Sequence, residues 1–401
     1  MKDIVLVTNY WHFDCEKASA RYSTLANMIV ARGYQLEVIT STFYHGTKSQ
    51  RNFNSDFFEQ FPFKVTLQYE PGYPRNVCLQ RFYSQSVFAK NVLKYLKKRK
   101  RPDVIYCVIP STDVAYKISK FAKAEGIPFI IDIQDLWPEA FKVAVNIPLV
   151  SDLAFYPIKR KAEIAYSNAD KIVAVSQTYV DRAKRVNSKY QCAIPIYLGI
   201  ELAEFNQIAE SRPMLRKPGD GFWIAYIGTL GHSYDIMCVI RAIKVLKDKG
   251  IDDIYFYVMG YGPLEQKFRD FANEQGVSDN VIFTGRLVYS DMVQRLCECD
   301  VAINPIVPNA AQSITNKHGD YFASKLPIIS TQNSAEYQAL LERYEAGINC
   351  SCGNYEELAK SILYLKENPA VRKQMGVNSG RVARELFDRR TTYKKIVDLL
   401  E

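Results

Sequence analysis

Short, almost wholly apolar runs alternate with helical stretches along the whole sequence. In the first half these runs occupy residues 3–9, 35–40, 103–109, 128–133 and 171–176. Runs this apolar are typical of parallel strands that are covered on both faces. Strands that alternate with helices in this way indicate an α/β fold with a doubly wound parallel sheet.

The same alternation restarts in the second half of the chain. Its apolar runs occupy residues 223–228, 254–260, 281–285, 300–305 and 326–331. The stretch 211–221, with two prolines and two glycines among polar residues, is the best linker candidate. The chain has 401 residues, and single cores stop growing near ~250–300 residues. We therefore predict two tandem Rossmann-like domains, 1–200 and 201–385, and a C-terminal helix, 386–401, that crosses back to the first domain.

The positive charge is concentrated in the first half. Residues 1–200 carry 28 Lys and Arg against 17 Asp and Glu, whereas residues 201–401 carry 24 against 26. A basic domain beside a neutral one indicates an anionic partner. Two clusters, within 88–101 and 158–161, predict amphipathic basic helices that suit an anionic membrane surface. The cations that we assign to this surface are Lys90, Lys94, Lys97, Lys98, Lys159, Arg160 and Lys161.

Two other interpretations of this excess of positive charge are a solvated outer face and a nucleic-acid-binding site. Nucleic acid is not an expected partner, because neither a known binding motif nor interleaved aromatic residues accompany the cations. No apolar run reaches the ~18–20 residues that span a bilayer. The N-terminus carries a short strand and not a signal-peptide core, so we expect a cytoplasmic protein at the inner face of the cell membrane. Neither the C-x-C pairs nor the four histidines have metal-ligand spacing, and no metal site is expected.

Three loops of the predicted second domain carry glycines directly after a strand, where ligands of such sheets bind. Glycines allow backbone N–H groups to approach a phosphate closely. None of the loops completes the G-x-G-x-x-G or Walker pattern, which disfavours a dinucleotide oxidoreductase or a P-loop ATPase. The candidate phosphate-binding residues are Gly228, Gly231, His232, Gly262, Pro263 and Arg286.

The segment 313–321 places a cation and a carboxylate on one predicted helical face. Lys317 and Asp320 are three residues apart, the spacing of neighbours on a helix. Lys317, preceded by Asn316, could neutralise a diphosphate, while Asp320 accepts hydrogen bonds from ribose hydroxyls. The alternative is an intrahelical ion pair between the two side chains.

In the first domain, the most unusual stretch is 131–141. Asp135 follows an apolar strand and stands beside Trp137 and Pro138. A carboxylate next to a large aromatic residue at a strand end is a candidate for acceptor binding or proton acceptance. The alternative for Asp135 is a helix N-cap. His12 and Ser19, in the loop after the first strand, complete the candidate acceptor site, although a structural role for His12 is the alternative.

Six stretches together resemble the retaining glycosyltransferases of the large family 4, and most closely its bacterial surface-polysaccharide branch. They are DLWPE (135–139), ADKIVAVSQTY (169–179), YIGTLG (226–231), VMGYGPLEQ (258–266), NVIFTGRL (280–287) and NKHGDYFASKLPIIS (316–330). The resemblance implies the GT-B fold, in which two Rossmann-like domains face a cleft. It implies a nucleotide-sugar donor on the second domain, an acceptor on the first, and transfer without a metal or other cofactor.

By this resemblance, Lys317 and Arg286 contact the diphosphate and Asp320 takes the place of the family's ribose-binding glutamate. The chain departs from the family at Gln312, where a glutamate is usual, and at residues 16–19, where a glycine pair is usual. His232 stands where the family often has a basic residue. The expected donor is a uridine-diphosphate sugar, and the expected catalytic residues are Asp135, His232 and Lys317.

The sequence thus predicts a glycosyltransferase that extends a lipid-linked saccharide in capsule, O-antigen or exopolysaccharide synthesis. One alternative is a nucleotide-sugar epimerase of the 2-epimerase type, which would need acid–base carboxylates and histidines around the sugar. The other alternative is a non-catalytic sugar-nucleotide-binding subunit, which Gln312 and the altered first loop favour.

Overall fold

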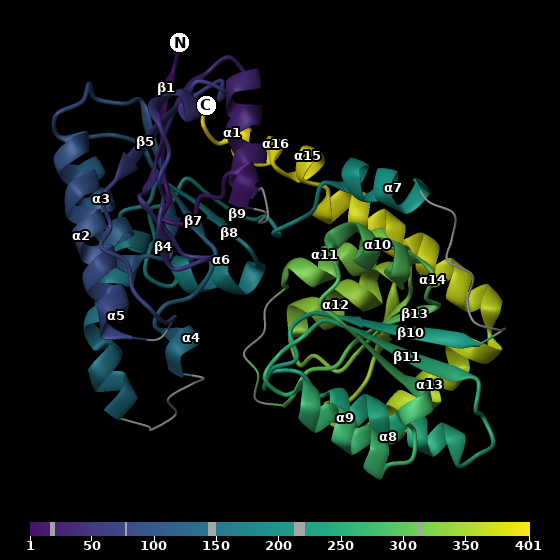
Figure 1. Cartoon of the computed structure of the whole chain (residues 1–401). Helices are drawn as coiled ribbons and strands as arrows, with labels where there is room; N and C mark the ends of the chain where they lie inside the picture. Colours follow the sequence, from purple (N-terminus) through teal and green to yellow (C-terminus); the bar gives the residue numbers. More distant parts are fainter. Residues whose placement is uncertain (17–20, 77, 143–149, 212–220, 309, 311–313) are drawn as a thin grey trace. The chain divides into compact units, whose positions relative to one another are not determined.

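The computed structural model describes residues 1–16, 21–76, 78–142, 150–211, 221–308, 310 and 314–401 (Figure 1). The chain divides into two compact units. Unit 1 comprises Met1–Tyr197 and Thr392–Glu401, and unit 2 comprises Leu198–Thr391. Each unit is built on its own parallel sheet, which confirms the predicted α/β fold with two Rossmann-like domains.

The sheet of unit 1 has the order β5-β2-β1-β6-β7-β8-β9, and all neighbouring strands are parallel. The central strands β6 and β7 are buried along their whole length, as their apolar sequences predict. The bounds are β1 (Asp3–Val7), β2 (Gln35–Ser41), β5 (Lys64–Gln68), β6 (Val104–Ile109), β7 (Phe129–Ile133), β8 (Lys171–Ala174) and β9 (Cys192–Pro195).

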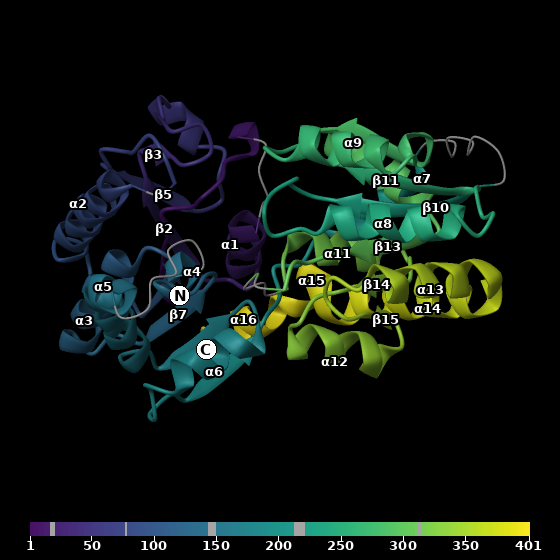
Figure 2. The same ribbon diagram turned by 90° about the horizontal axis from the view of Figure 1, so that it is seen from below.

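Helices cover both faces of this sheet. On one face α2 (Leu79–Leu96), α3 (Thr112–Ala124) and α5 (Val150–Ser167) lie side by side (Figure 2). Phe88, Ile118 and Ala162 of these helices belong to one apolar cluster. On the other face α1 (Arg21–Ala31) packs against a second cluster. Smaller elements are the hairpin of β3 (Phe43–Tyr44) and β4 (Ser49–Gln50), α4 (Glu139–Lys142) and α6 (Gln177–Lys184).

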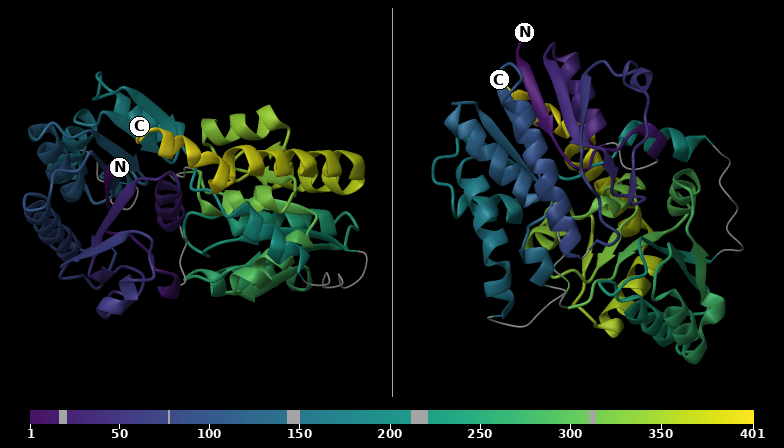
Figure 3. Two further views of the ribbon diagram at one scale, coloured as in Figure 1. Left: turned by 90° about the horizontal axis from the view of Figure 1, so that it is seen from above. Right: turned by 60° about the vertical axis from the view of Figure 1, so that its left-hand side comes forward.

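The C-terminal segment completes unit 1. Tyr393 and Ile396, the latter in α16 (Lys394–Asp398), are fully buried in the cluster that includes α1. Arg21 donates a hydrogen bond of 2.9 Å to the Tyr393 hydroxyl and pairs with the buried Asp132 at 3.2 Å. The two ends of the chain lie next to each other (Figure 3), and Lys2 Nζ donates to the carbonyl oxygen of Leu400.

The sheet of unit 2 has the order β12-β11-β10-β13-β14-β15 and is also parallel. Helices α8 and α9 lie on one side of it, and α10 and α11 on the other (Figure 1). The strands are β10 (Phe222–Ile227), β11 (Ile254–Met259), β12 (Val281–Gly285), β13 (Val301–Asn304), β14 (Ile328–Ser330) and β15 (Gly347–Asn349). The helices are α7 (Leu202–Glu210), α8 (Ile236–Lys247), α9 (Glu265–Glu274), α10 (Tyr289–Cys297), α11 (Asn316–Ala323), α12 (Ala335–Tyr344), α13 (Tyr355–Glu367) and α14 (Pro369–Val382).

Two features differ from the prediction. Strands β5, β9 and β15 were not expected, because each is the edge of a sheet and its residues are only partly buried. In place of the expected single helix over 386–401 there are two short helices, α15 (Arg389–Thr392) and α16: the extended backbone of Asp388 precedes α15, and Tyr393 separates the two. The chain leaves unit 1 at residue 197 and returns at 392, and residues 212–220 of the expected linker lie outside the described residues.

The described residues contain neither a bilayer-spanning helix nor a group of metal ligands. None of their helices combines the length and the apolarity that crossing a bilayer requires. Within the same ranges, no three His, Cys, Asp or Glu side chains are grouped as metal ligands.

Candidate functional site

The three glycine loops of unit 2 are held together by backbone hydrogen bonds at the carboxyl edge of the sheet. Gly228 N–H donates to Met259 at 3.1 Å, and Gly260 N–H donates to Gly285 at 3.0 Å. The next contact joins Leu230 N–H to Tyr261 at 3.1 Å. The predicted loops therefore form one continuous backbone layer beyond β10, β11 and β12.

Close approach explains two of the glycines. A Cβ on Gly260 would lie 1.8 Å from the carbonyl oxygen of Gly228, and one on Gly262 would lie 2.4 Å from that of Leu230. Gly231 is different, since a Cβ there would meet only Thr229 at 3.9 Å. Gly262 is thus required by loop packing, whereas a Cβ at Gly231 would make only an ordinary van der Waals contact.

Helix α11 is fixed at the same edge by its own residues. Thr315 and His318 form a capping box at its N-terminus, which satisfies backbone donors of the first turn. The Tyr321 hydroxyl donates to Ile303 and accepts from the backbone N–H of Ile227, each at 3.0 Å. The start of α11 therefore lies beside the ends of β10 and β13.

Lys317 lies in the first turn of α11 with its ammonium group buried. Its Nζ is 4.0 Å from the centre of the Tyr234 ring and 5.0 Å from that of Tyr226. The Nζ atom of Lys317 has no hydrogen-bond partner among the described residues. The alternative of an ion pair between Lys317 and Asp320 is therefore not observed among them. Burial lowers the pKa of Lys317 well below its usual value. The lysine stem also reaches the first glycine loop, since a Cβ on Gly228 would lie 3.9 Å from its Cδ.

Asp320, one turn further along α11, accepts a hydrogen bond of 2.9 Å from the Tyr289 hydroxyl at the start of α10. Burial raises the pKa of Asp320 to about 6, although the Tyr289 hydrogen bond and the charge of Arg389 act to lower it. Tyr289 is 44% exposed. The pair thus presents a carboxylate and a phenol at an accessible edge, two groups suited to binding hydroxyls.

The other predicted residues of unit 2 are exposed. His232 follows Gly231 in the first loop, Pro263 precedes α9, and Asn316 opens α11. Arg286 follows Gly285, and its guanidinium carbon lies 5.6 Å from the ring centre of Tyr261, which is itself 55% exposed. Tyr261 and Tyr289 were not predicted, because an exposed tyrosine has no sequence signature.

In unit 1, Asp135 and Trp137 lie together after β7. The indole Nε1 of Trp137 donates to Asp135 Oδ2 at 3.2 Å. Burial raises the pKa of Asp135. The guanidinium carbon of Arg81 lies 4.6 Å from the ring centre of Trp137, and Arg81 donates a hydrogen bond of 2.8 Å to the Tyr10 hydroxyl. Arg81 and Tyr10 therefore extend the predicted acceptor site.

Two predicted residues of the acceptor site remain, and the structure describes His12 but not Ser19. The His12 ring lies 5.7 Å from the Tyr44 ring, and its buried Nδ1 has no hydrogen-bond partner in the described ranges. Burial lowers the pKa of His12. Ser19 lies outside the described residues.

The outer face of α2, α3 and α5 carries the predicted surface cations. Lys90, Lys94, Lys97, Lys98, Lys159 and Arg160 are exposed, and Lys161 pairs with Asp113. Burial lowers the pKa of Lys117 on α3, and the charges of Lys161 and Lys90 lower it further, against the effect of Asp113. Cations from three neighbouring helices are thus close enough to influence one another.

Part of unit 2 matches a known protein family, and two relatives match longer stretches of the chain. Residues 221–368 match the family "Glycosyl transferases group 1". An uncharacterized glycosyltransferase, MJ1069 of Methanocaldococcus jannaschii, is 23% identical over 254 residues, which are 62% of this chain and 63% of that protein. The lipopolysaccharide core biosynthesis glycosyltransferase LpsD of Rhizobium meliloti is 19% identical over 240 residues, 59% of this chain and 65% of LpsD. The matches thus span less than two thirds of either relative.

Solved structures resemble the chain over nearly its whole length. Anabaena Alr3699/HepE in complex with UDP has a TM-score of 0.71 at 16% identity and covers 100% of this chain and 99% of its own. WaaG, a glycosyltransferase involved in lipopolysaccharide biosynthesis, has a TM-score of 0.64 at 14% identity, with 99% of each chain covered. The predicted resemblance and the GT-B fold are therefore confirmed: residues 221–368 match the glycosyl transferases group 1 family, and the chain is folded like GT-B glycosyltransferases.

Proposed function

We propose that this protein is a retaining glycosyltransferase that moves a sugar from a uridine-diphosphate donor to a saccharide acceptor. One observation carries the proposal: the buried ammonium of Lys317 lacks a counter-charge among the described residues, beside the glycine loops of unit 2. A buried cation without a partner is costly, and a diphosphate at this edge would supply the missing negative charge. The UDP in the HepE structure supports a uridine nucleotide as the donor.

The proposed chemistry needs no covalent enzyme intermediate. The loops 228–233, 260–263 and 285–288 contain no Asp or Glu that could attack the sugar. The acceptor hydroxyl therefore attacks the anomeric carbon from the face that the diphosphate leaves. The bond from that carbon to the diphosphate oxygen breaks, and the departing oxygen takes the hydroxyl proton. Lys317, Arg286 and His232 stabilise the charge that develops on the diphosphate, so we propose a reaction that requires no metal.

For the acceptor we propose a saccharide on a lipid diphosphate, in the synthesis of capsule, O-antigen or exopolysaccharide. The similarity to LpsD and WaaG, both named for lipopolysaccharide synthesis, supports a surface glycan. Asp135 would orient the acceptor hydroxyl, and the buried Trp137 indole would hold the Asp135 carboxylate in place through its hydrogen bond. Both residues lie at the carboxyl edge of the unit 1 sheet, after β7, where ligands of such sheets bind.

We further propose that unit 1 binds the inner face of the cell membrane through the outer face of α2, α3 and α5. The cations of these helices would lie against anionic headgroups. Leu153 and Tyr156 of α5 are 78% and 54% exposed beside Lys159 and Arg160. Apolar side chains flanked by cations are typical of interfacial helices.

The test is incubation of the purified protein with a panel of nucleotide-sugars and a lipid-diphosphate-linked sugar, followed by product analysis. A glycosylated lipid with retained anomeric configuration is the expected result. A free epimerised nucleotide-sugar would instead establish an epimerase. Binding of a nucleotide-sugar without turnover would establish a non-catalytic subunit.

A further inference from the structure

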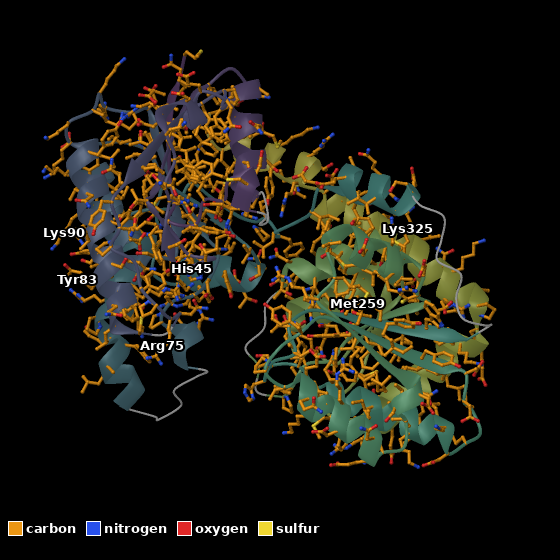
Figure 4. All side chains as sticks on the ribbon, viewed as in Figure 1. His45, Arg75, Tyr83, Lys90, Met259 and Lys325 are labelled. Carbon is orange, nitrogen blue, oxygen red and sulfur yellow. The ribbon has the colours of Figure 1, made fainter. Side chains whose placement is uncertain are left out.

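A hollow opens in unit 1 between the β3–β4 hairpin and the first turns of α2. Its volume is about 430 Å³, within the ~300–1,000 Å³ that small-molecule sites occupy. We call it the α2 hollow and define it by six of the side chains that line it: Phe43, Lys48, Gln50, Tyr73, Gln80 and Tyr83. Figure 4 marks Tyr83 on the outer side of α2.

The chemistry of the lining matches a sugar ring. Tyr73 and Phe43 are each 5% exposed and pack on one another with ring centres 4.9 Å apart, whereas the Tyr83 side chain is 66% exposed and accessible. The apolar C–H face of a pyranose packs on such aromatic surfaces, and its hydroxyls need donors and acceptors such as side-chain amides. Gln80 is exposed, and Gln50 Nε2 donates to the carbonyl oxygen of Glu70 at 2.8 Å, which fixes the orientation of its amide.

Lys48 adds a cation at a fixed position. Its backbone is left-handed, with a φ of 58°, a strained conformation for a residue other than glycine. Its ammonium donates to the carbonyl oxygen of His45 and lies 5.4 Å from the centre of the Tyr73 ring. A cation held in this way favours a sugar that carries an acidic group.

A continuous set of contacts joins the α2 hollow to the predicted acceptor site. The Tyr73 hydroxyl lies 2.6 Å from His45 Nδ1, and the His45 and Tyr10 rings meet edge to face at 5.3 Å. Tyr10 accepts a hydrogen bond from Arg81, which lies over Trp137, the partner of Asp135. All of these groups belong to unit 1, so side-chain contacts within that unit connect the hollow to Asp135.

We propose that the α2 hollow binds a sugar unit of the acceptor other than the one that receives the transferred sugar. The inference rests on the proposed function, because it takes the ligand to be part of a saccharide acceptor. It assigns Tyr83 and Gln80 to recognition of the ring and Lys48 to recognition of an acidic substituent. The α2 hollow would thereby select acceptors by their length and their charge.

Binding is tested without turnover by saturation-transfer NMR with the methyl glycosides of glucose, galactose, mannose, N-acetylglucosamine and glucuronic acid. At least one glycoside should bind the wild type, and Tyr83→Ala and Gln80→Ala should each weaken it about threefold or more. Tyr83→Phe should retain binding, as should Tyr364→Ala, a matched removal of an exposed tyrosine from unit 2 (46% exposed). Absence of binding by every glycoside, or binding that both hollow variants leave unchanged, would overturn the proposal.

Turnover provides the second test. The ratio of kcat/KM for a trisaccharide acceptor to that for a monosaccharide acceptor should fall about fivefold or more in Tyr83→Ala. Lys48→Gln should remove a preference for a glucuronic-acid unit in the longer acceptor. An unchanged ratio in Tyr83→Ala would refute the acceptor role. A protein that binds the glycosides at Tyr83 but transfers no sugar would support the sugar site and overturn the proposed function, so the two failures are distinguishable.

Discussion

The Nζ atom of Lys317 lies 4.0 Å from the centre of the Tyr234 ring. The electron-rich face of an aromatic ring attracts a cation, but it does not replace the hydrogen bonds that an ammonium group loses on leaving water. The position is therefore costly for the free protein and favourable once an anion reaches it.

Lys317→Met should leave the fold intact and raise its stability, because an apolar side chain of similar length replaces a buried cation without a partner. Affinity for UDP should fall roughly 10–100-fold, since one charge-assisted contact contributes about 1.5–3 kcal/mol, whereas affinity for uridine should be retained. Thermal unfolding and calorimetric titration measure the two effects. Lys267→Met, at an exposed position of α9, is the control, and equal UDP affinity in both variants would contradict the site.

Donor binding should weaken as the pH falls through about 6, because Asp320 titrates there. Protonation removes the acceptors that ribose hydroxyls need. Since the folded-state pKa lies above the usual value, this group also makes the protein less stable as the pH rises from about 4 to about 6. Asp320→Asn should remove the contribution of Asp320 to both dependences, whereas Asp279→Asn, an exposed control, should preserve it. UDP titrations and thermal unfolding between pH 4 and 8 measure them, and a flat wild-type profile would speak against Asp320.

Tyr289→Phe should move the midpoint of the same pH profile upward. The Tyr289 hydroxyl donates to the Asp320 carboxylate at 2.9 Å and thereby favours its ionised form. At pH 7 the variant should bind UDP about twofold more weakly, because a rise of about one unit in the pKa would leave about half of the carboxyl groups protonated. An unchanged midpoint would show that the hydrogen bond does not persist in solution.

Asp135→Asn should slow transfer about 100-fold or more while leaving UDP affinity unaltered. The asparagine amide retains an oxygen that can accept the hydrogen bond from the Trp137 indole, so the local fold should be kept. The variant therefore tests the loss of the negative charge alone. Steady-state rates, together with UDP titration, separate the two effects. Asp56→Asn, on the exposed surface of unit 1, is the control, and a fully active Asp135→Asn would remove this residue from the mechanism.

Replacing Lys90, Lys94, Lys97 and Lys98 by Gln should strongly reduce sedimentation with phosphatidylserine vesicles, because each cation contributes ~1 kcal/mol near such a surface. Transfer to a lipid-linked acceptor should slow, whereas transfer to a short soluble acceptor should not. A variant with Lys249, Lys267, Lys360 and Lys373 replaced by Gln removes the same charge from exposed positions of unit 2. If the first variant sediments as well as the wild type, the membrane proposal is wrong.

The sequence predicts the interior strands of both sheets, whereas of the four edge strands it predicts only β12. Strands such as β6 and β7 are buried on both faces and therefore need unbroken apolar runs. Edge strands such as β5 (KVTLQ) and β9 (CAIP) are half-exposed and carry polar or proline residues. Nothing in their composition separates them from loops.

The residues of the candidate site were likewise predicted only in part. Lys317 and Asp320 share a helix, so their spacing alone brings them near one another. The rings around Lys317, the phenol on Asp320 and the guanidinium over Trp137 come from distant segments, and only folding brings them into contact. Arg81 stands within an ordinary helical stretch, and only the structure reveals its contact with Trp137.

The order in which the two units are completed during translation follows from the return of the chain at residue 392. Unit 2 is one uninterrupted stretch, so all of its residues have been made before residues 392–401 follow. Unit 1, although its synthesis starts first, must wait for Tyr393 and Ile396 before its α1 face is closed. Domains usually fold in the order in which they are made. Unit 1 is thus made first but completed last, and formation of the Arg21–Tyr393 contact marks its completion.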